Sequence, residues 1–166
     1  MNIKLDELCK RWQGWAKSTD HSENGWQSDF NQWNELMSEA QKTMLSSTQH
    51  DLDFENLELC WKISEEEELL ADFSKDNLDR CLEVVRTLSK SKFPEVRWQV
   101  YDVAKYAERM GEDIVRKGLE DQDPYCRKRA IMSLAYMRPN EIATLKSRFS
   151  LDPDPHVRRA IESFPN

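Results

Sequence analysis

The order of apolar and polar residues follows a helical period over most of the chain. After Pro94, apolar residues recur every four positions at Val96, Val100 and Ala104, and a similar stripe follows Pro124. This spacing places apolar side chains on one face of a helix. The pattern predicts an all-α protein whose later helices cover residues 64–73, 77–90, 94–109, 112–120, 124–137, 140–149 and 155–163.

The first 62 residues contain helical patterns of a different kind. We expect one amphipathic helix from Leu5 to Trp15, a longer one from Trp26 to Met44 and a short one from Leu52 to Trp61. The turn-forming residues 18–25 predict a loop between the first two. These helices are either degenerate repeats or a cap on the repeats that follow, and their tryptophans are expected in the core.

A phrase of four residues recurs in the second part of the chain at intervals of 30 and 31 residues. Asp123 and Asp154 precede two of its prolines, and a carboxylate there can accept hydrogen bonds from the first turn of a helix. Gly111 and Pro139 are expected to break the chain between the two helices of a pair. The phrase occurs as Pro94-Glu95-Val96-Arg97, Pro124-Tyr125-Cys126-Arg127 and Pro155-His156-Val157-Arg158.

The phrase resembles the start of a HEAT repeat, a pair of antiparallel helices. The match covers about residues 64–166 and is most specific at 121–127 and 152–158. It implies a short, right-handed α-solenoid with repeats at 64–93, 94–123, 124–154 and 155–166, the last one partial, and with residues 1–62 packed against them in one compact unit. It also implies an internal ladder in which arginines pair with aspartates of adjoining repeats: Arg97, Arg127 and Arg158 with Asp121 and Asp152.

Charge is divided unevenly in a chain of 31 acidic and 24 basic residues. Residues 1–74 carry a net charge of −10 and residues 75–166 carry +3, which favours a basic partner and makes nucleic acid an unlikely one. The run 65–68 also fits a simple helix start, because Ser64 and Glu67 form a capping box. With no long apolar run and no secretory signal, we expect a cytoplasmic protein without a membrane partner.

No sequence pattern favours catalysis, a cofactor, a metal site or a small-molecule ligand. The three histidines lack a second ligand at metal-binding spacing, and the scattered Cys9, Cys60, Cys81 and Cys126 are expected to be buried free thiols. The one enzyme class that remains an alternative is a HEAT-like DNA glycosylase, whose basic groove could begin at Lys128, Arg129, Arg158 and Arg159. Several aromatic residues point away from the predicted core, and they either pack against the next repeat or form a binding surface: Trp98, Tyr106, Tyr125 and Tyr136, with Met132 beside them.

In size, charge and repeat type the chain resembles the immunity proteins encoded beside contact-dependent or other polymorphic bacterial toxins. That resemblance implies a non-catalytic protein that binds a basic toxin domain, such as a nuclease, and covers its active site. A general scaffold or adaptor is the alternative. The candidate partner-binding residues are the acidic Asp51, Asp53, Glu55, Glu58, Glu65 and Glu66, with Trp98, Tyr125 and Tyr136 as apolar anchors.

Overall fold

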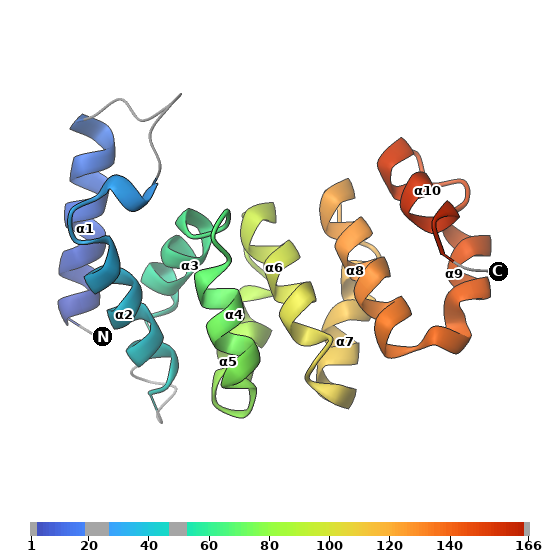
Figure 1. Cartoon of the computed structure of the whole chain (residues 1–166), viewed down its shortest axis with the longest axis horizontal. Coiled ribbons are helices and arrows are strands. Elements are labelled where there is room, and N and C mark those ends of the chain that lie inside the picture. The colour runs from blue at the N-terminus through green and yellow to red at the C-terminus, as the bar shows by residue number, and fades with distance from the viewer. Residues whose placement is uncertain (1–2, 19–26, 47–52, 165–166) are drawn as a thin grey trace. The chain divides into compact units, whose positions relative to one another are not determined.

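The computed structural model describes residues 3–18, 27–46 and 53–164, and within these ranges every regular element is a helix (Figure 1). The all-α prediction is therefore confirmed. The first part contains α1 (Ile3–Ser18), the 3₁₀ helix η1 (Gln27–Asp29), α2 (Trp33–Met44), α3 (Phe54–Ile63), α4 (Leu69–Asp76) and α5 (Leu78–Leu88). The second part contains α6 (Pro94–Ala104), α7 (Glu108–Gly118), α8 (Pro124–Met137), the 3₁₀ helix η3 (Pro139–Glu141), α9 (Ile142–Phe149) and α10 (Pro155–Glu162).

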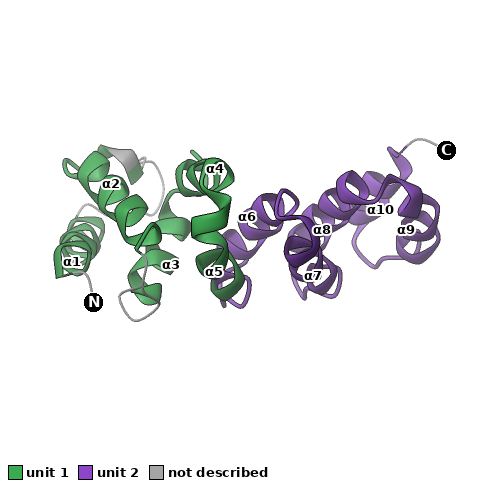
Figure 2. Cartoon of the chain, turned by 90° about the horizontal axis from the view of Figure 1, so that it is seen from below, with its two compact units in different colours: residues 1–87 green, residues 88–166 purple. Residues whose placement is uncertain are grey.

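The helices form two compact units, residues 1–87 (unit 1) and residues 88–166 (unit 2), coloured separately in Figure 2. Residues 63–87, which the sequence pattern groups with the repeats, belong to unit 1. The division also separates the charges. Unit 1 has 19 acidic and 9 basic residues, a net charge of −10, and unit 2 has 12 acidic and 15 basic residues, a net charge of +3.

Unit 1 is built around α2, which packs against α1, α3 and α4. Its core holds apolar side chains from each of these helices, among them the fully buried Leu5, Leu36, Trp61 and Leu70. Trp33 is also buried, whereas Trp12 and Trp15 are half-buried on α1. The tryptophans of the described helices thus contribute to the core to different degrees, and Trp26 lies outside the described residues.

Unit 2 follows the repeated phrase closely. The prolines open α6, α8 and α10, and α8 packs against α6, α7, α9 and α10. The cap predictions are confirmed, since Asp123 accepts from the amide of Cys126 at 3.0 Å and Asp154 from that of His156 at 2.8 Å. The predicted stripes are buried as expected: Val96, Val100 and Ala104 on α6, Cys126, Ala130 and Leu134 on α8, and Val157 and Ile161 on α10.

Gly111 does not lie between two helices, which corrects the sequence-based expectation. α6 ends at Ala104 and α7 begins at Glu108, whose φ of 43° lies in the left-handed region. Gly111 lies inside α7, and a Cβ at this position would come within 1.8 Å of the carbonyl oxygen of Ala104. The glycine is therefore needed for the close approach of α7 to the end of α6.

The capping box at Ser64 is also absent. Ser64 follows the last turn of α3 and donates its hydroxyl to the carbonyl of Trp61 at 3.5 Å. α4 begins only at Leu69, because Glu68 has a φ of 49° and interrupts the helical path. The acidic run thus forms a turn between two helices. Likewise, the predicted helix from Trp26 to Met44 is divided, and its described part consists of η1 and α2.

The four cysteines are free and buried, as predicted. The sulfur atoms of Cys9 on α1 and Cys60 on α3 lie 3.8 Å apart, and the contact with Cys9 together with burial raises the pKa of Cys60. None of the described helices is both long enough and apolar enough to cross a membrane.

Candidate functional site

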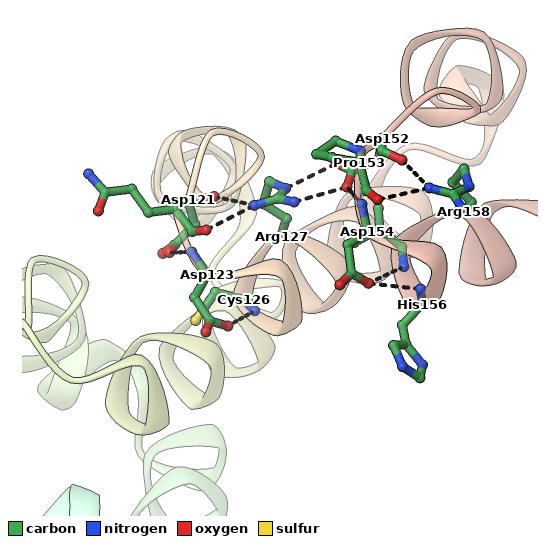
Figure 3. Close-up of polar contacts among 11 residues, drawn as sticks. Asp121, Asp123, Cys126, Arg127, Asp152, Pro153, Asp154, His156 and Arg158 are labelled. Atoms are coloured by element: carbon green, nitrogen blue, oxygen red, sulfur yellow. Dashed lines mark hydrogen bonds and ion pairs between the residues drawn. The ribbon is translucent and has the colours of Figure 1, made fainter.

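The repeated arginines and aspartates connect successive turns of unit 2. Arg97 on α6 donates twice to the carboxylate of Asp121, at 2.7 Å for both bonds. Arg127 on α8 does the same to Asp152, at 3.0 and 2.9 Å. Each arginine also reaches back to a carbonyl in the turn before its own helix. Arg97 donates to the carbonyl of Ser91, and Arg127 donates to that of Asp121 (Figure 3).

These contacts shift the ionisation of the buried carboxyls. Burial raises the pKa of Asp121, but hydrogen bonds from Arg97, the Asp123 amide and the Tyr101 hydroxyl outweigh it, so the pKa lies below its usual value. The hydrogen bond from Arg127 lowers the pKa of Asp152 in the same way. Both carboxylates remain charged at neutral pH and hold the turns in place. This ladder lies inside the protein, so we assign it a structural role.

Arg158, the third of the repeated arginines, bonds to backbone carbonyls and to no carboxylate that the structure describes. It donates to the carbonyls of Asp152 and Pro153, at 2.6 and 3.0 Å, and forms no ion pair within the described residues (Figure 3). Arg129, another cation of the predicted basic groove, is paired with Asp102. Two of the four groove cations are therefore held by internal bonds.

The outward aromatic residues of α6 and α8 meet each other across the two helices. Trp98 packs edge-on against Tyr125, with ring centroids 5.6 Å apart. The Arg129 guanidinium lies over the Trp98 ring at 4.8 Å and the Lys128 ammonium over the Tyr125 ring at 5.5 Å. Trp98 is only 6% exposed, whereas Tyr125 is 46% exposed. Trp98 thus supports the exposed Tyr125 from below.

The same contacts continue toward the end of α8. The Asp102 carboxylate pairs with both Arg129 and Lys105. The Lys105 ammonium lies 5.1 Å from the ring centroid of Tyr106 and 5.7 Å from that of Tyr136. These two rings pack edge to face, with their centroids 5.8 Å apart. Tyr136 is 63% exposed, so this end of the arrangement also faces solvent.

We call these eight residues the α6–α8 row. The sequence pattern singled out the aromatic members and two of the cations but missed Asp102 and Lys105. The sequence spacing could have revealed them, because Asp102 stands four and Lys105 seven positions after Trp98, which places them on the same face of a helix. The row consists of Lys128, Tyr125, Trp98, Arg129, Asp102, Lys105, Tyr106 and Tyr136.

The acidic candidates lie in unit 1, apart from the row in the sequence. Asp53 caps α3 and accepts from the Asn56 amide at 3.3 Å, so it has a structural role. Glu55, Glu58 and Glu66 form no ion pair with any described residue. Glu65 is half-buried, and Asp51 lies outside the described residues. The usable acidic surface is therefore the outer side of α3 and the turn that follows.

A depression in unit 1 adds two carboxylates that the sequence analysis did not select. Asp29 is the last residue of η1 and Glu67 lies in the turn before α4, and both are exposed without an ion pair among the described residues. Helices α2 and α4 are in contact, which explains why residues distant in sequence share this site. The depression is lined by Asp29, Phe30, Asn31, Trp33, Asn34, Glu67 and Leu69.

The chemistry of this depression suits a cation. Carboxylates and amide oxygens accept hydrogen bonds, and the buried rings of Phe30 and Trp33 can pack against the carbon chain of a lysine or arginine. In the described part of the chain, no group of three or more His, Cys, Asp or Glu side chains is arranged to hold a metal ion.

Comparisons with protein-family models, with curated proteins and with solved structures found no match to this chain.

Proposed function

We propose that this chain is a non-catalytic protein-binding module that captures a basic partner through unit 1, and that the partner is a bacterial toxin domain which it neutralises. The supporting observation is the depression between η1, α2 and α4, in which Asp29 and Glu67 form no ion pair with any residue that the structure describes. In unit 2, by contrast, Asp121 and Asp152 form ion pairs with Arg97 and Arg127 of the same unit. Carboxylates left unpaired in unit 1 are available to another molecule.

Neutralisation would require only steric and electrostatic contact. A lysine or arginine of the partner enters the depression, while Glu55 and Glu66, which are exposed in the same unit, serve as further acceptors. The net charge of −10 on unit 1 attracts a basic protein and raises its association rate more than its affinity. Such a partner, covered at a basic active-site cleft, could not bind its own anionic substrate.

The remaining parts of the chain have a supporting role in this proposal. The helix pairs of unit 2 are HEAT-like repeats stacked in a short solenoid, and the protein acts in the cytoplasm. A general adaptor is the alternative function. Binding of a DNA duplex is less favoured, because Arg129 and Arg158 are engaged by Asp102 and by backbone carbonyls.

The experiment is an affinity capture from the source cell with three baits, followed by mass spectrometry. The wild-type protein is compared with a double variant, Asp29→Lys with Glu67→Lys. The control is Glu162→Lys, which reverses an exposed carboxylate on α10. We expect a basic protein on the wild-type and control baits that is missing from the double variant. Capture of the same proteins by all three baits would contradict the proposed site.

The toxin assignment is tested separately by expressing the captured protein in a host cell with and without this chain. We expect growth arrest by the partner alone and recovery when the wild-type chain is present. The double variant at Asp29 and Glu67 should fail to restore growth. A partner that binds but does not arrest growth would favour the adaptor.

A further inference from the structure

The α6–α8 row has the composition of a docking surface, although the proposed function makes no use of it. Four of the seven exposed large apolar side chains among the described residues gather on or beside it. Three of them are the tyrosines of the row, and the fourth is Met132, which is 43% exposed and lies on the same face of α8 as Tyr125 and Tyr136. Tyrosine, methionine and arginine are enriched where proteins bind proteins.

The charges of the row indicate the chemistry of what binds there. The row contains three cations and one carboxylate, Asp102, which pairs with two of the cations. The third cation, Lys128, forms no ion pair within the described residues and lies over the exposed ring of Tyr125. The surface therefore carries an excess of positive charge at its rim, in a chain whose total charge is −7.

We infer that the α6–α8 row is a second binding site, which takes an extended acidic segment of another protein with carboxylates on either side of an apolar side chain. One carboxylate would meet Lys128, the other would share Lys105 with Asp102 at the opposite end, and the apolar side chain would pack on Tyr125, Met132 and Tyr136. This site is independent of the acidic depression, so the protein could hold a basic and an acidic partner.

The dimensions of α8 set the length of the segment. Tyr125 and Tyr136 are 11 residues apart on this helix, which at 1.5 Å per residue corresponds to about 16 Å. An extended chain covers that distance in about five residues. A single-stranded nucleic acid fits less well, because its continuous negative charge would lie against Asp102, whereas the peptide places an uncharged side chain between its carboxylates.

The test uses a phage-displayed library of random dodecapeptides, panned on the full-length protein. We expect enriched peptides with at least two acidic residues flanking an aromatic or aliphatic one. Binding of a labelled enriched peptide is then measured by fluorescence anisotropy for the wild type, Tyr136→Ala and Lys128→Glu. Each variant should weaken binding by about tenfold or more if these residues are central to the site.

The controls are matched to the two variants. Leu151→Ala shortens an apolar side chain that is 89% exposed in the turn after α9, and Lys117→Glu reverses an exposed cation on α7. Neither should change the affinity, and circular dichroism should show that all variants keep the wild-type helix content. The peptide with glutamine in place of its acidic residues should bind less tightly than the original.

Three results would overturn the inference. The library could yield no enriched peptide, it could yield basic peptides, or the enriched peptide could bind Tyr136→Ala and Lys128→Glu as tightly as the wild type. Binding of labelled (dT)₂₀ that is lost in Tyr136→Ala would reassign the row to nucleic acid. Self-association of the protein in sedimentation experiments, abolished by the same change, would identify a second copy as the occupant. The capture experiment on Asp29 and Glu67 is unaffected by any of these outcomes.

Discussion

Asp121 and Asp152 occupy equivalent positions in successive repeats but have different numbers of donors. Both accept two bonds from an arginine and one from the amide two residues later. Asp121 also accepts from the hydroxyl of Tyr101 at 2.8 Å. The residue 30 positions after Tyr101 is Ile131, which has no hydroxyl, so Asp152 lacks that bond. One substitution in the repeat thus changes the number of hydrogen bonds that the carboxylate accepts.

This difference predicts unequal effects of the same mutation at the two positions. Asp121→Ala should lower the free energy of unfolding by about 3–5 kcal/mol, because it leaves the mostly buried Arg97 side chain without its carboxylate partner. Asp152→Ala should cost about 1 kcal/mol less, because it does not also orphan a tyrosine hydroxyl. Urea unfolding followed by circular dichroism measures both. Equal losses would show that the bond to Tyr101 contributes no net stability.

At the scale of helices, the sequence predicted the starts in unit 2 better than the ends. The proline with its preceding aspartate is a local signal, and α8 and α10 begin where that signal places them. The end of α6 at Ala104 depends on contacts with α7, which a local pattern does not contain. The same limit explains the acidic run, where a sequence that fits a capping box forms a turn after α3 instead.

The candidate site was predictable to a similar extent. Helix geometry placed Tyr125 and Tyr136 on an outward face, and both are exposed. It did not reveal that Trp98 is buried beneath Tyr125 and Arg129, because this contact joins two helices. The depression with Asp29 and Glu67 was missed for the same reason, since its residues come from segments nearly 40 positions apart.

The packing of α7 against its neighbours predicts a contrast between two glycines. A Cβ at Gly118 would lie 2.8 Å from both the Ala130 Cβ and the Tyr101 Cζ, whereas a Cβ at Gly14 meets no atom within 4 Å. Gly118→Ala should therefore destabilise the protein by about 1–3 kcal/mol through overpacking. Gly14→Ala, in the exposed middle of α1, should stabilise it by about 0.5–1 kcal/mol. Melting temperatures that move in the same direction would contradict this description of the helix contacts.

The inward stripes of α6 and α8 predict a stronger effect. Val100 and Leu134 are fully buried, so an aspartate at either position would place an unpaired carboxylate in the core. Val100→Asp and Leu134→Asp should each unfold unit 2, which hydrogen exchange would detect as lost protection in α6–α10. Leu151→Asp is the control, because this leucine is 89% exposed. A variant with Val100→Asp that keeps wild-type protection would disprove the inward orientation of this stripe.

At the scale of the whole molecule, the two units use their charges differently. Unit 2 pairs its buried carboxylates with arginines and has a net charge of only +3, whereas unit 1 keeps exposed carboxylates without described ion-pair partners and carries −10. Paired buried charges contribute to stability and are weakly screened by salt, whereas exposed charges act mainly on encounter with other molecules. The proposed capture of a basic partner therefore rests on the exposed carboxylates of unit 1, whereas the paired carboxylates of the ladder stabilise the fold of unit 2.

The response of the protein to acid follows from this difference. The pKa values of Asp121 and Asp152 are lower in the folded protein than the usual value of 3.8. A carboxyl of this kind stabilises the fold fully above its unfolded pKa, and this contribution is lost as the pH falls through the folded pKa. We expect nearly constant stability of the ladder from pH 7 to about pH 5 and a progressive loss below about pH 4.

The double variant Asp121→Asn with Asp152→Asn should be less stable at pH 7 but should lose less stability between pH 5 and pH 3, as measured by urea unfolding. If the wild type and the variant lose the same amount over that interval, the acid sensitivity comes from carboxyls outside the ladder.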